Sequence, residues 1–178
     1  MTHEIIFAGF GGQGILSAAK LLAYAAMHEG KNVSWLPSYG PEKRGGTSNC
    51  HVVISDDPVG SPFINTATAV VLMSMPALDK FESLVVSGGV LIYDSDTVKK
   101  EPVRKDLKIK GIPAARMANE LGLNKLANMI LLGALVKETN AVSRDAILKS
   151  IPKILSEDKQ HMIPDEIKTF ELGVNYEG

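Results

Sequence analysis

Short apolar runs alternate with segments of helical periodicity along this chain of 178 residues. Apolar runs bounded by glycine, proline or aspartate are typical of buried strands. Apolar residues that recur every three or four positions are typical of helices packed on one face. The expected strands are residues 5–8, 33–36, 49–55, 69–73 and 90–93, and the expected helices are residues 15–29, 76–85, 113–121, 124–139, 143–155 and 164–172.

This alternation predicts an α/β fold, in which one Rossmann-like domain over residues 1–178 has a largely parallel sheet with helices on both faces. The first strand, the first helix and the strand 33–36 form an expected βαβ opening. Pro37 is expected to end that second strand, because proline cannot donate to a sheet ladder. Residues 99–110 are basic and polar, which is typical of a solvated surface segment.

Two expected helical segments are apolar enough to be candidates for an interface with a partner chain. Residues 124–139 are apolar on most sides, which predicts a helix that is either buried or faces another chain. The tail, with Ile163, Ile167 and Phe170, is a second candidate for apolar surface. For both segments, burial in the core of this chain is the other interpretation.

Composition narrows the classes of function. The chain is 45% hydrophobic and 22% charged with a net charge of −1, so it has no basic excess for nucleic acid or for an acidic membrane surface. Its longest apolar run, residues 129–136, is too short to span a bilayer. The N-terminus lacks the basic and apolar regions of a secretory signal, and we therefore expect a cytoplasmic protein with no membrane partner.

Cysteine and histidine offer little for metal binding. The chain has one cysteine, Cys50, whereas an iron–sulfur cluster usually needs about four thiolates. Its four histidines show no metal-ligand spacing. Cys50 and His51 are neighbours on an expected strand and should point to opposite faces, so Cys50 is interpreted as a small buried apolar residue.

The first candidate for ligand chemistry is the segment GFGGQG. Gly9, Gly11 and Gly14 fit the pattern G-x-G-x-x-G between a strand and a helix, where free backbone N–H groups suit a phosphate. A tight turn without a ligand is the other interpretation. A dinucleotide site would also need an acid at the end of the second strand, and residues 34–38 contain none. NAD is therefore not expected.

The second candidate is the segment SYGPEKRGGT, residues 38–47. Connections of this kind gather where parallel strands end, so this loop is expected beside the glycine loop. Lys43 and Arg44 would supply positive charge, and the glycine pair Gly45–Gly46 would allow an anion-binding turn. An exposed loop whose cations only aid solubility is the alternative. Together, the two loops predict a site for an anionic, phosphorylated ligand.

The combination of GFGGQG with SYGPEKRGG, and the later NKLANMILLGALV, resembles the gamma subunit of 2-oxoacid:ferredoxin oxidoreductases, most closely the 2-oxoglutarate type. The resemblance implies a heteromeric enzyme that converts a 2-oxoacid and coenzyme A into acyl-CoA, carbon dioxide and reduced ferredoxin. It implies alpha and beta partner subunits, with a ferredoxin-like delta subunit as a further candidate. Thiamine diphosphate, magnesium and iron–sulfur clusters would lie on these partners, and this chain alone would hold no cofactor tightly.

Carried over to this sequence, the resemblance implies that the chain helps to form the coenzyme A site and covers the partner's thiamine diphosphate. It implies no catalytic residue and no metal ligand here, and a structural or interfacial role for Asn128. Arg44 is favoured over Lys43 as a phosphate contact. The implied contacts are Gly11, Gly12, Gln13, Gly14, Lys43, Arg44, Gly45, Gly46 and Thr47.

Two other functions remain open from the sequence. One is a stand-alone module that binds a nucleotide or coenzyme A without an oxidoreductase partner. The other is a gamma-like chain of an indolepyruvate or branched-chain oxoacid enzyme. The residues of this chain discriminate weakly between oxoacids, because partner subunits are expected to contact the oxoacid side chain.

Overall fold

A six-stranded sheet in the order β2-β3-β1-β4-β5-β6 forms the centre of the molecule. The computed structural model describes residues 1–39 and 46–178, so the predicted contacts Lys43, Arg44 and Gly45 lie outside the described residues. The elements are β1 Thr2–Phe10, α1 Ile15–His28, β2 Asn32–Tyr39, β3 Thr47–Ser55, β4 Ala67–Leu72, α2 Met75–Phe81, η1 Glu82–Leu84, β5 Val85–Asp94, β6 Lys108–Ile112, α3 Ala114–Glu120, η2 Asn124–Leu126, α4 Ala127–Thr139, α5 Arg144–Ile154, η3 Glu157–Met162 and α6 Ile163–Val174.

The sheet is mostly parallel, as expected. Strands β1, β4, β5 and β6 pair in parallel, whereas β3 runs antiparallel to both of its neighbours, β1 and β2. The predicted βαβ opening is therefore modified, because β3 lies between β1 and β2 rather than leaving them adjacent. The predicted α/β fold is confirmed.

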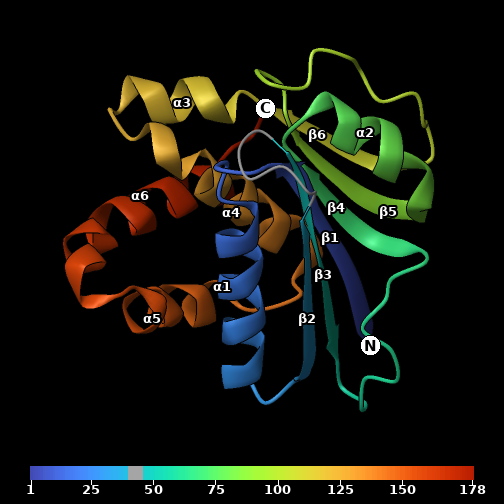
Figure 1. The fold of residues 1–178 in the computed structure, drawn as a ribbon, viewed down its shortest axis with the longest axis horizontal. Coiled ribbons are helices and arrows are strands. Elements are labelled where there is room, and N and C mark those ends of the chain that lie inside the picture. Colours follow the sequence, from blue (N-terminus) through green and yellow to red (C-terminus); the bar gives the residue numbers. More distant parts are fainter. Residues whose placement is uncertain (40–45) are drawn as a thin grey trace.

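The two faces of the sheet are covered unequally (Figure 1). Helices α1, α4, α5 and α6 lie on one side, and the short α2 lies on the other. Alternation along β1 divides its side chains between these layers, since Ile5 and Phe7 join the large cluster while Ile6 and Ala8 join the smaller one.

Helix α4 is the centre of the helical layer. All ten residues from Ala127 to Val136 are buried, so of the two interpretations of this apolar helix, burial in the core is confirmed. In the tail, Phe170 is also buried, while Ile163 and Ile167 are partly exposed.

Among residues 1–39 and 46–178, no helix has both the length and the apolar character needed to cross a membrane.

Two glycines allow α6 to pack directly on α4. A Cβ atom at Gly133 would collide with the backbone of Phe170, and one at Gly173 would collide with the backbone of Ile130. The helices therefore approach through their backbones rather than through side chains. This close packing brings α6 and the preceding η3 towards α1.

One expected strand boundary was wrong, and one strand was not expected at all. Strand β2 does not end at Pro37 but continues to Tyr39, with Pro37 opposite Cys50. Proline is tolerated there because β2 is an edge strand and one of its sides needs no donor. Strand β6 was also not expected, since Lys108–Ile112 lies partly in the basic stretch that was interpreted as surface, although it pairs with β5 at the opposite edge.

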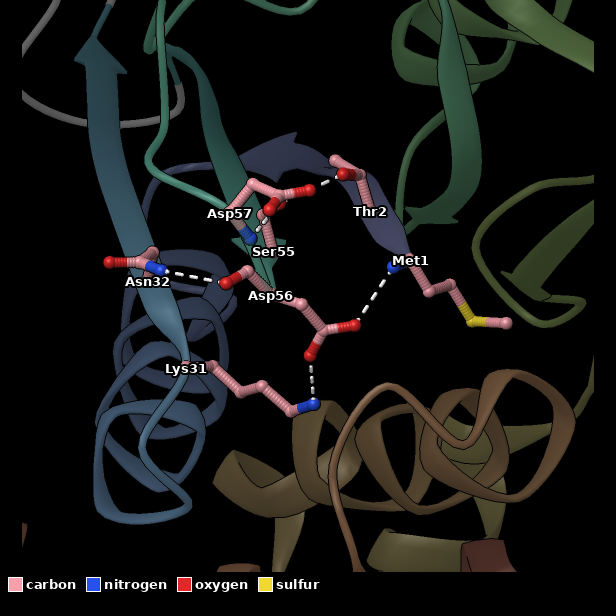
Figure 2. Close-up of polar contacts among 7 residues, drawn as sticks. All are labelled: Met1, Thr2, Lys31, Asn32, Ser55, Asp56 and Asp57. Atoms are coloured by element: carbon pink, nitrogen blue, oxygen red, sulfur yellow. Dashed lines mark hydrogen bonds and ion pairs between the residues drawn. The ribbon is translucent and has the colours of Figure 1, made fainter.

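Asp56 ties together the ends of three strands (Figure 2). Its Oδ2 accepts a 2.8 Å bond from the amino group of Met1, and its Oδ1 pairs with Lys31. Its backbone oxygen accepts a 3.1 Å bond from the Asn32 side chain. The two cations lower the pKa of Asp56 to about 2. The hydrogen bond from Lys31 makes the largest contribution to this shift.

This network predicts that Asp56 contributes to the free energy of unfolding in a way that depends on pH. Because folding lowers the Asp56 pKa from 3.8 to about 2, its carboxylate stabilises the fold above pH 3.8, and this contribution is lost as the pH falls towards 2. Asp56→Asn should therefore be less stable than the native chain at neutral pH, with a gap that closes over that interval. Urea unfolding at a series of pH values measures the gap. Asp57→Asn is the control, and an equal pH dependence for both variants would contradict the assignment.

Candidate ligand-binding site

Gln13 connects the glycine loop between β1 and α1 to the neighbouring backbone through both ends of its amide. Its Oε1 accepts a 2.6 Å bond from Phe10 N, and its Nε2 donates a 2.9 Å bond to Met73 O, just beyond β4. Gly12 and Gly14 have φ values of 91° and 78°, which side chains rarely adopt. Gly14 is also the N-cap of α1, so the loop delivers the start of that helix to the carboxyl end of β1.

The two loops predicted from the sequence meet at this edge of the sheet. The N–H of Gly11 donates a 2.8 Å bond to Gly46 O, immediately before β3. This N–H is therefore used within the fold and is not available to a ligand. Within the described part of the chain, the N–H groups of Gly12 and Gly14 have no such backbone partner.

A cavity of about 640 Å³ opens beside these loops, a size typical of sites for small molecules. The start of α1, the facing ends of β2 and β3, the start of α4 and the segment from α5 to α6 enclose it. The lining residues are Phe10, Gly11, Gly12, Gly14, Ile15, Leu16, Ser17, Tyr39, Gly46, Thr47, Ser48, Lys125, Leu126, Asn128, Leu155, Lys159, Met162 and Glu166.

The electrostatics of this cavity favour an anion. The positive end of the 14-residue helix α1 points into it, and Lys125 and Lys159 contribute two side-chain cations. Neither lysine forms a salt bridge with an acid among the residues that the structure describes. Glu166 is the acid of the lining, and burial raises its pKa, while Lys159 opposes that shift.

A second recess of about 210 Å³ adjoins the first cavity between α1, α4 and α5. The two share five lining residues and are therefore neighbouring parts of one site. The shared residues are Ser17, Asn128, Leu155, Lys159 and Glu166. In the second recess, Leu21, Met129, Ile151, Ile154 and Leu155 form the apolar part of the wall, and polar and charged residues, among them Lys20, Lys159 and Glu166, form the rest.

Asn128 lies at the junction of the two cavities. It is 6% exposed, and its Nδ2 donates a 3.0 Å bond to Gly14 O at the cap of α1. Its Oδ1 has no hydrogen-bond partner among the described residues. Asn128 therefore joins α4 to the glycine loop and retains an unused acceptor.

The structure brings together five of the nine residues predicted as contacts. Gln13 contributes to the loop rather than to the cavity lining, since both ends of its amide are bonded within the fold. Lys125, Lys159 and Glu166 were not predicted as contacts. Lys125 belongs to the segment NKLANMILLGALV that carries the resemblance, whereas nothing in the local sequence of Lys159 or Glu166 distinguishes them from other surface charges. The predicted residues that line the cavity are Gly11, Gly12, Gly14, Gly46 and Thr47.

Cys50 and His51 do not take part in this site. Cys50 is fully buried in the large hydrophobic cluster, and burial raises the pKa of its thiol to about 12. His51 points to the other face, where its Nδ1 accepts a 3.1 Å bond from Ile64 N. The interpretation of Cys50 as a buried apolar residue is confirmed.

Among residues 1–39 and 46–178, no group of three or more His, Cys, Asp or Glu side chains could hold a metal ion.

Comparison with known proteins identifies the family. A family model described as pyruvate ferredoxin/flavodoxin oxidoreductase matches residues 4–176. The chain belongs to this family. The resemblance to oxoacid:ferredoxin oxidoreductase gamma subunits that was inferred from the sequence is thereby confirmed.

Similar members of the family differ in length and in the oxoacid that they are named for. The chain is 41% identical to 2-oxoglutarate synthase subunit KorC of Methanocaldococcus jannaschii, covering 86% of each. It is 39% identical to ketoisovalerate oxidoreductase subunit VorA of Methanothermobacter marburgensis, and here it spans 97% of its own length but only 36% of the relative. These relatives do not decide between the two oxoacids.

Solved structures support the same fold. The gamma subunit of a keto/oxoacid ferredoxin oxidoreductase from Geobacter sulfurreducens PCA superposes with a TM-score of 0.81 at 32% identity. That match covers 98% of this chain and 99% of the other, so the two chains correspond from end to end. A 2-oxoglutarate:ferredoxin oxidoreductase from Magnetococcus marinus superposes with a TM-score of 0.87 over 97% of this chain and 30% of its own, and at 22% identity it shows the fold alone.

Proposed function

We propose that this chain is the gamma-type subunit of a cytoplasmic 2-oxoacid:ferredoxin oxidoreductase, and that it binds coenzyme A beside a partner's thiamine diphosphate. The observation that carries this proposal is the 640 Å³ cavity, where the glycine loop, the start of α1 and two lysines converge in a member of this family. The proposed reaction converts 2-oxoacid and coenzyme A into acyl-CoA and carbon dioxide, with electrons passed to ferredoxin.

The chemistry of the cavity fits the phosphates of coenzyme A. The amides of Gly12 and Gly14 and the first turn of α1 suit a pyrophosphate, and Lys125 and Lys159 supply countercharge. We propose that Lys43, Arg44 and Gly45 add further contacts. Coenzyme A supplies the thiol that accepts the acyl group, whereas the residues of this chain bind and orient it.

The remaining chemistry is assigned to other subunits. We propose that alpha and beta partners, with a delta subunit as a further candidate, hold thiamine diphosphate, magnesium and the iron–sulfur clusters. We propose 2-oxoglutarate as the oxoacid, because SYGPEKRGG resembles the 2-oxoglutarate type and the KorC relative is named for it. The VorA relatives make a branched-chain oxoacid the competing substrate.

Native purification through a tag on this chain tests the assignment. We expect iron-containing partner chains to co-purify, and the eluate to reduce viologen only when coenzyme A and a 2-oxoacid are both present. A panel of 2-oxoglutarate, ketoisovalerate, pyruvate and indolepyruvate then identifies the substrate. A chain that elutes alone and colourless, from cells that produce the partners, would refute the subunit assignment and favour a stand-alone binding module.

A further inference from the structure

A third, polar recess of about 110 Å³ lies on the α2 side of the sheet, opposite the helical layer. The carboxyl end of β1, the start of β3 and helix α2 border it. Among the strands, α2 packs mainly against β1 and β4, so β3 lies at the margin of the cover that this helix provides (Figure 1). The recess is therefore open to solvent, or to another molecule, at its β3 side.

The polar side chains of this recess can donate hydrogen bonds. Ser74 is 2% exposed, and its Oγ accepts a 3.2 Å bond from Ala77 N, which leaves its own O–H to donate. Lys80 adds an ammonium group from α2, and Asn49 adds an amide from β3. Among the described residues, no acidic side chain lines the recess. These side chains are therefore suited to an anionic acceptor.

The charge of Lys80 is not neutralised within the described part of the chain. Lys80 forms no salt bridge there, and its neighbour Asp79 pairs with Lys100 at 3.2 Å instead. The Lys80 Nζ lies 5.3 Å from the centre of the Phe81 ring. This contact orders the side chain without neutralising its charge, so Lys80 can still pair with an anion.

His51 extends this donor surface along β3. Asn49 and His51 are two positions apart, so they project from the same face of the strand. Because His51 Nδ1 accepts the bond from Ile64 N, the hydrogen of the neutral ring is on Nε2, which can donate. Burial, and then the charge of Lys80, lower the pKa of His51, so this ring is neutral near pH 7.

An exposed aromatic residue adjoins these donors. Phe63 is 65% exposed and directly precedes Ile64, whose N–H is bonded to His51. Aromatic residues are enriched at protein interfaces, where polar groups surround them. The recess is also far smaller than the range of about 300–1,000 Å³ that is typical of small-molecule sites, although a single carboxylate group fits. Both features favour a side chain of another protein over a free small molecule.

We propose that this recess receives the carboxylate of an aspartate or glutamate side chain from a partner subunit, and that Lys80, Asn49 and Ser74 bind it. The carboxylate supplies acceptors for the donors of the recess and neutralises Lys80. Apolar residues of the same partner cover Phe63. The partner is one of the subunits proposed above, so this contact depends on that assignment.

A zero-length crosslink detects the contact directly. A carbodiimide joins an amine to a carboxylate only where the two touch, so the assembled enzyme should yield an amide between Lys80 and an aspartate or glutamate of a partner. Peptide mass spectrometry identifies both residues. Lys80→Arg keeps the charge but cannot form this amide, so it should assemble normally and lose the crosslink. A native assembled enzyme in which Lys80 joins no carboxylate of a partner would overturn the inference.

The affinity for purified alpha and beta subunits gives a second, independent measurement. In biolayer interferometry Lys80→Glu should weaken their binding about 100-fold at low salt, because two like charges then face each other. This loss should shrink in about 1 M salt. Lys149→Glu, the same charge reversal at an exposed position on α5, is the control and should change the affinity by less than about twofold.

The outcomes separate this contact from the proposed function. Unchanged affinity in Lys80→Glu would refute the contact alone. If that variant also had a raised KM for the 2-oxoacid, the recess would bind a carboxylate of the free substrate, which would overturn the assignment to a partner. A native chain that binds neither subunit would refute the proposed function as well.

Discussion

Gly173→Ala should destabilise the chain by about 3 kcal/mol, the upper end of what is usual for overpacking a close contact. The added methyl group would collide with the backbone of Ile130 on α4, and a backbone cannot rotate away as a side chain can. Alanine gains at most about 1 kcal/mol over glycine in a helix interior, so the collision outweighs the better helix propensity. Gly133→Ala should behave similarly, because it meets the backbone of Phe170 from the other side of the same contact.

Urea unfolding followed by circular dichroism measures this loss. Gly60→Ala is the matched control, since no atom lies within 4 Å of a Cβ at that exposed loop position, and we expect a change of less than about 0.5 kcal/mol. Displacement of α6 should also move Glu166 and the preceding η3 away from the cavity. Gly173→Ala should therefore bind coenzyme A more weakly even where it remains folded. Full stability in Gly173→Ala would show that the two helices can separate without cost.

The double substitution Lys125→Ala with Lys159→Ala should weaken coenzyme A about tenfold in the assembled enzyme. Each lysine is exposed at the edge of the cavity, so a contact with phosphate is worth about 1 kcal/mol or less rather than the larger value of a buried pair. Two such contacts together correspond to about one decade in the dissociation constant. Because exposed charges are screened, the effect should shrink in about 1 M salt.

Calorimetric titration at low and high salt measures both parts of this prediction. Lys99→Ala, which removes an exposed lysine that does not line either cavity, is the control and should leave the affinity unchanged. The thiamine diphosphate proposed for the partner subunit should remain bound in every variant. A double variant with unchanged affinity at low salt would show that the phosphates bind elsewhere.

Local sequence was sufficient where an element depends on its own residues. The apolar runs of β1, β4 and β5 and the periodicity of α1 predicted these elements, because burial on a sheet or helix face leaves a period that can be read directly. The segment G-x-G-x-x-G predicted the turn from β1 to α1 for the same reason, since Gly12 and Gly14 adopt conformations that other residues avoid. The meeting of the two loops followed from general rules of α/β topology.

Elements that depend on their neighbours could not be predicted in this way. Pro37 fits within β2 only because that strand lies at the sheet edge, and the charged strand β6 forms only because β5 offers a free edge. Whether α4 was core or interface also depended on α6, which covers it through the glycine contacts. These outcomes are set by pairing partners that lie far away in the chain.

The sequence by itself determined the α/β class, the glycine turn and the family, because each rests on residue types at fixed short spacing. Only the tertiary structure decided which side chains share the cavity. Asn128, Lys159 and Glu166 are far from Gly14 in the chain and reach it through the packing of α4, α5 and α6 around α1. The hydrophobic effect that drives this packing has no preferred direction, and the final arrangement depends on close contacts throughout the helical layer. A local sequence pattern therefore does not predict it.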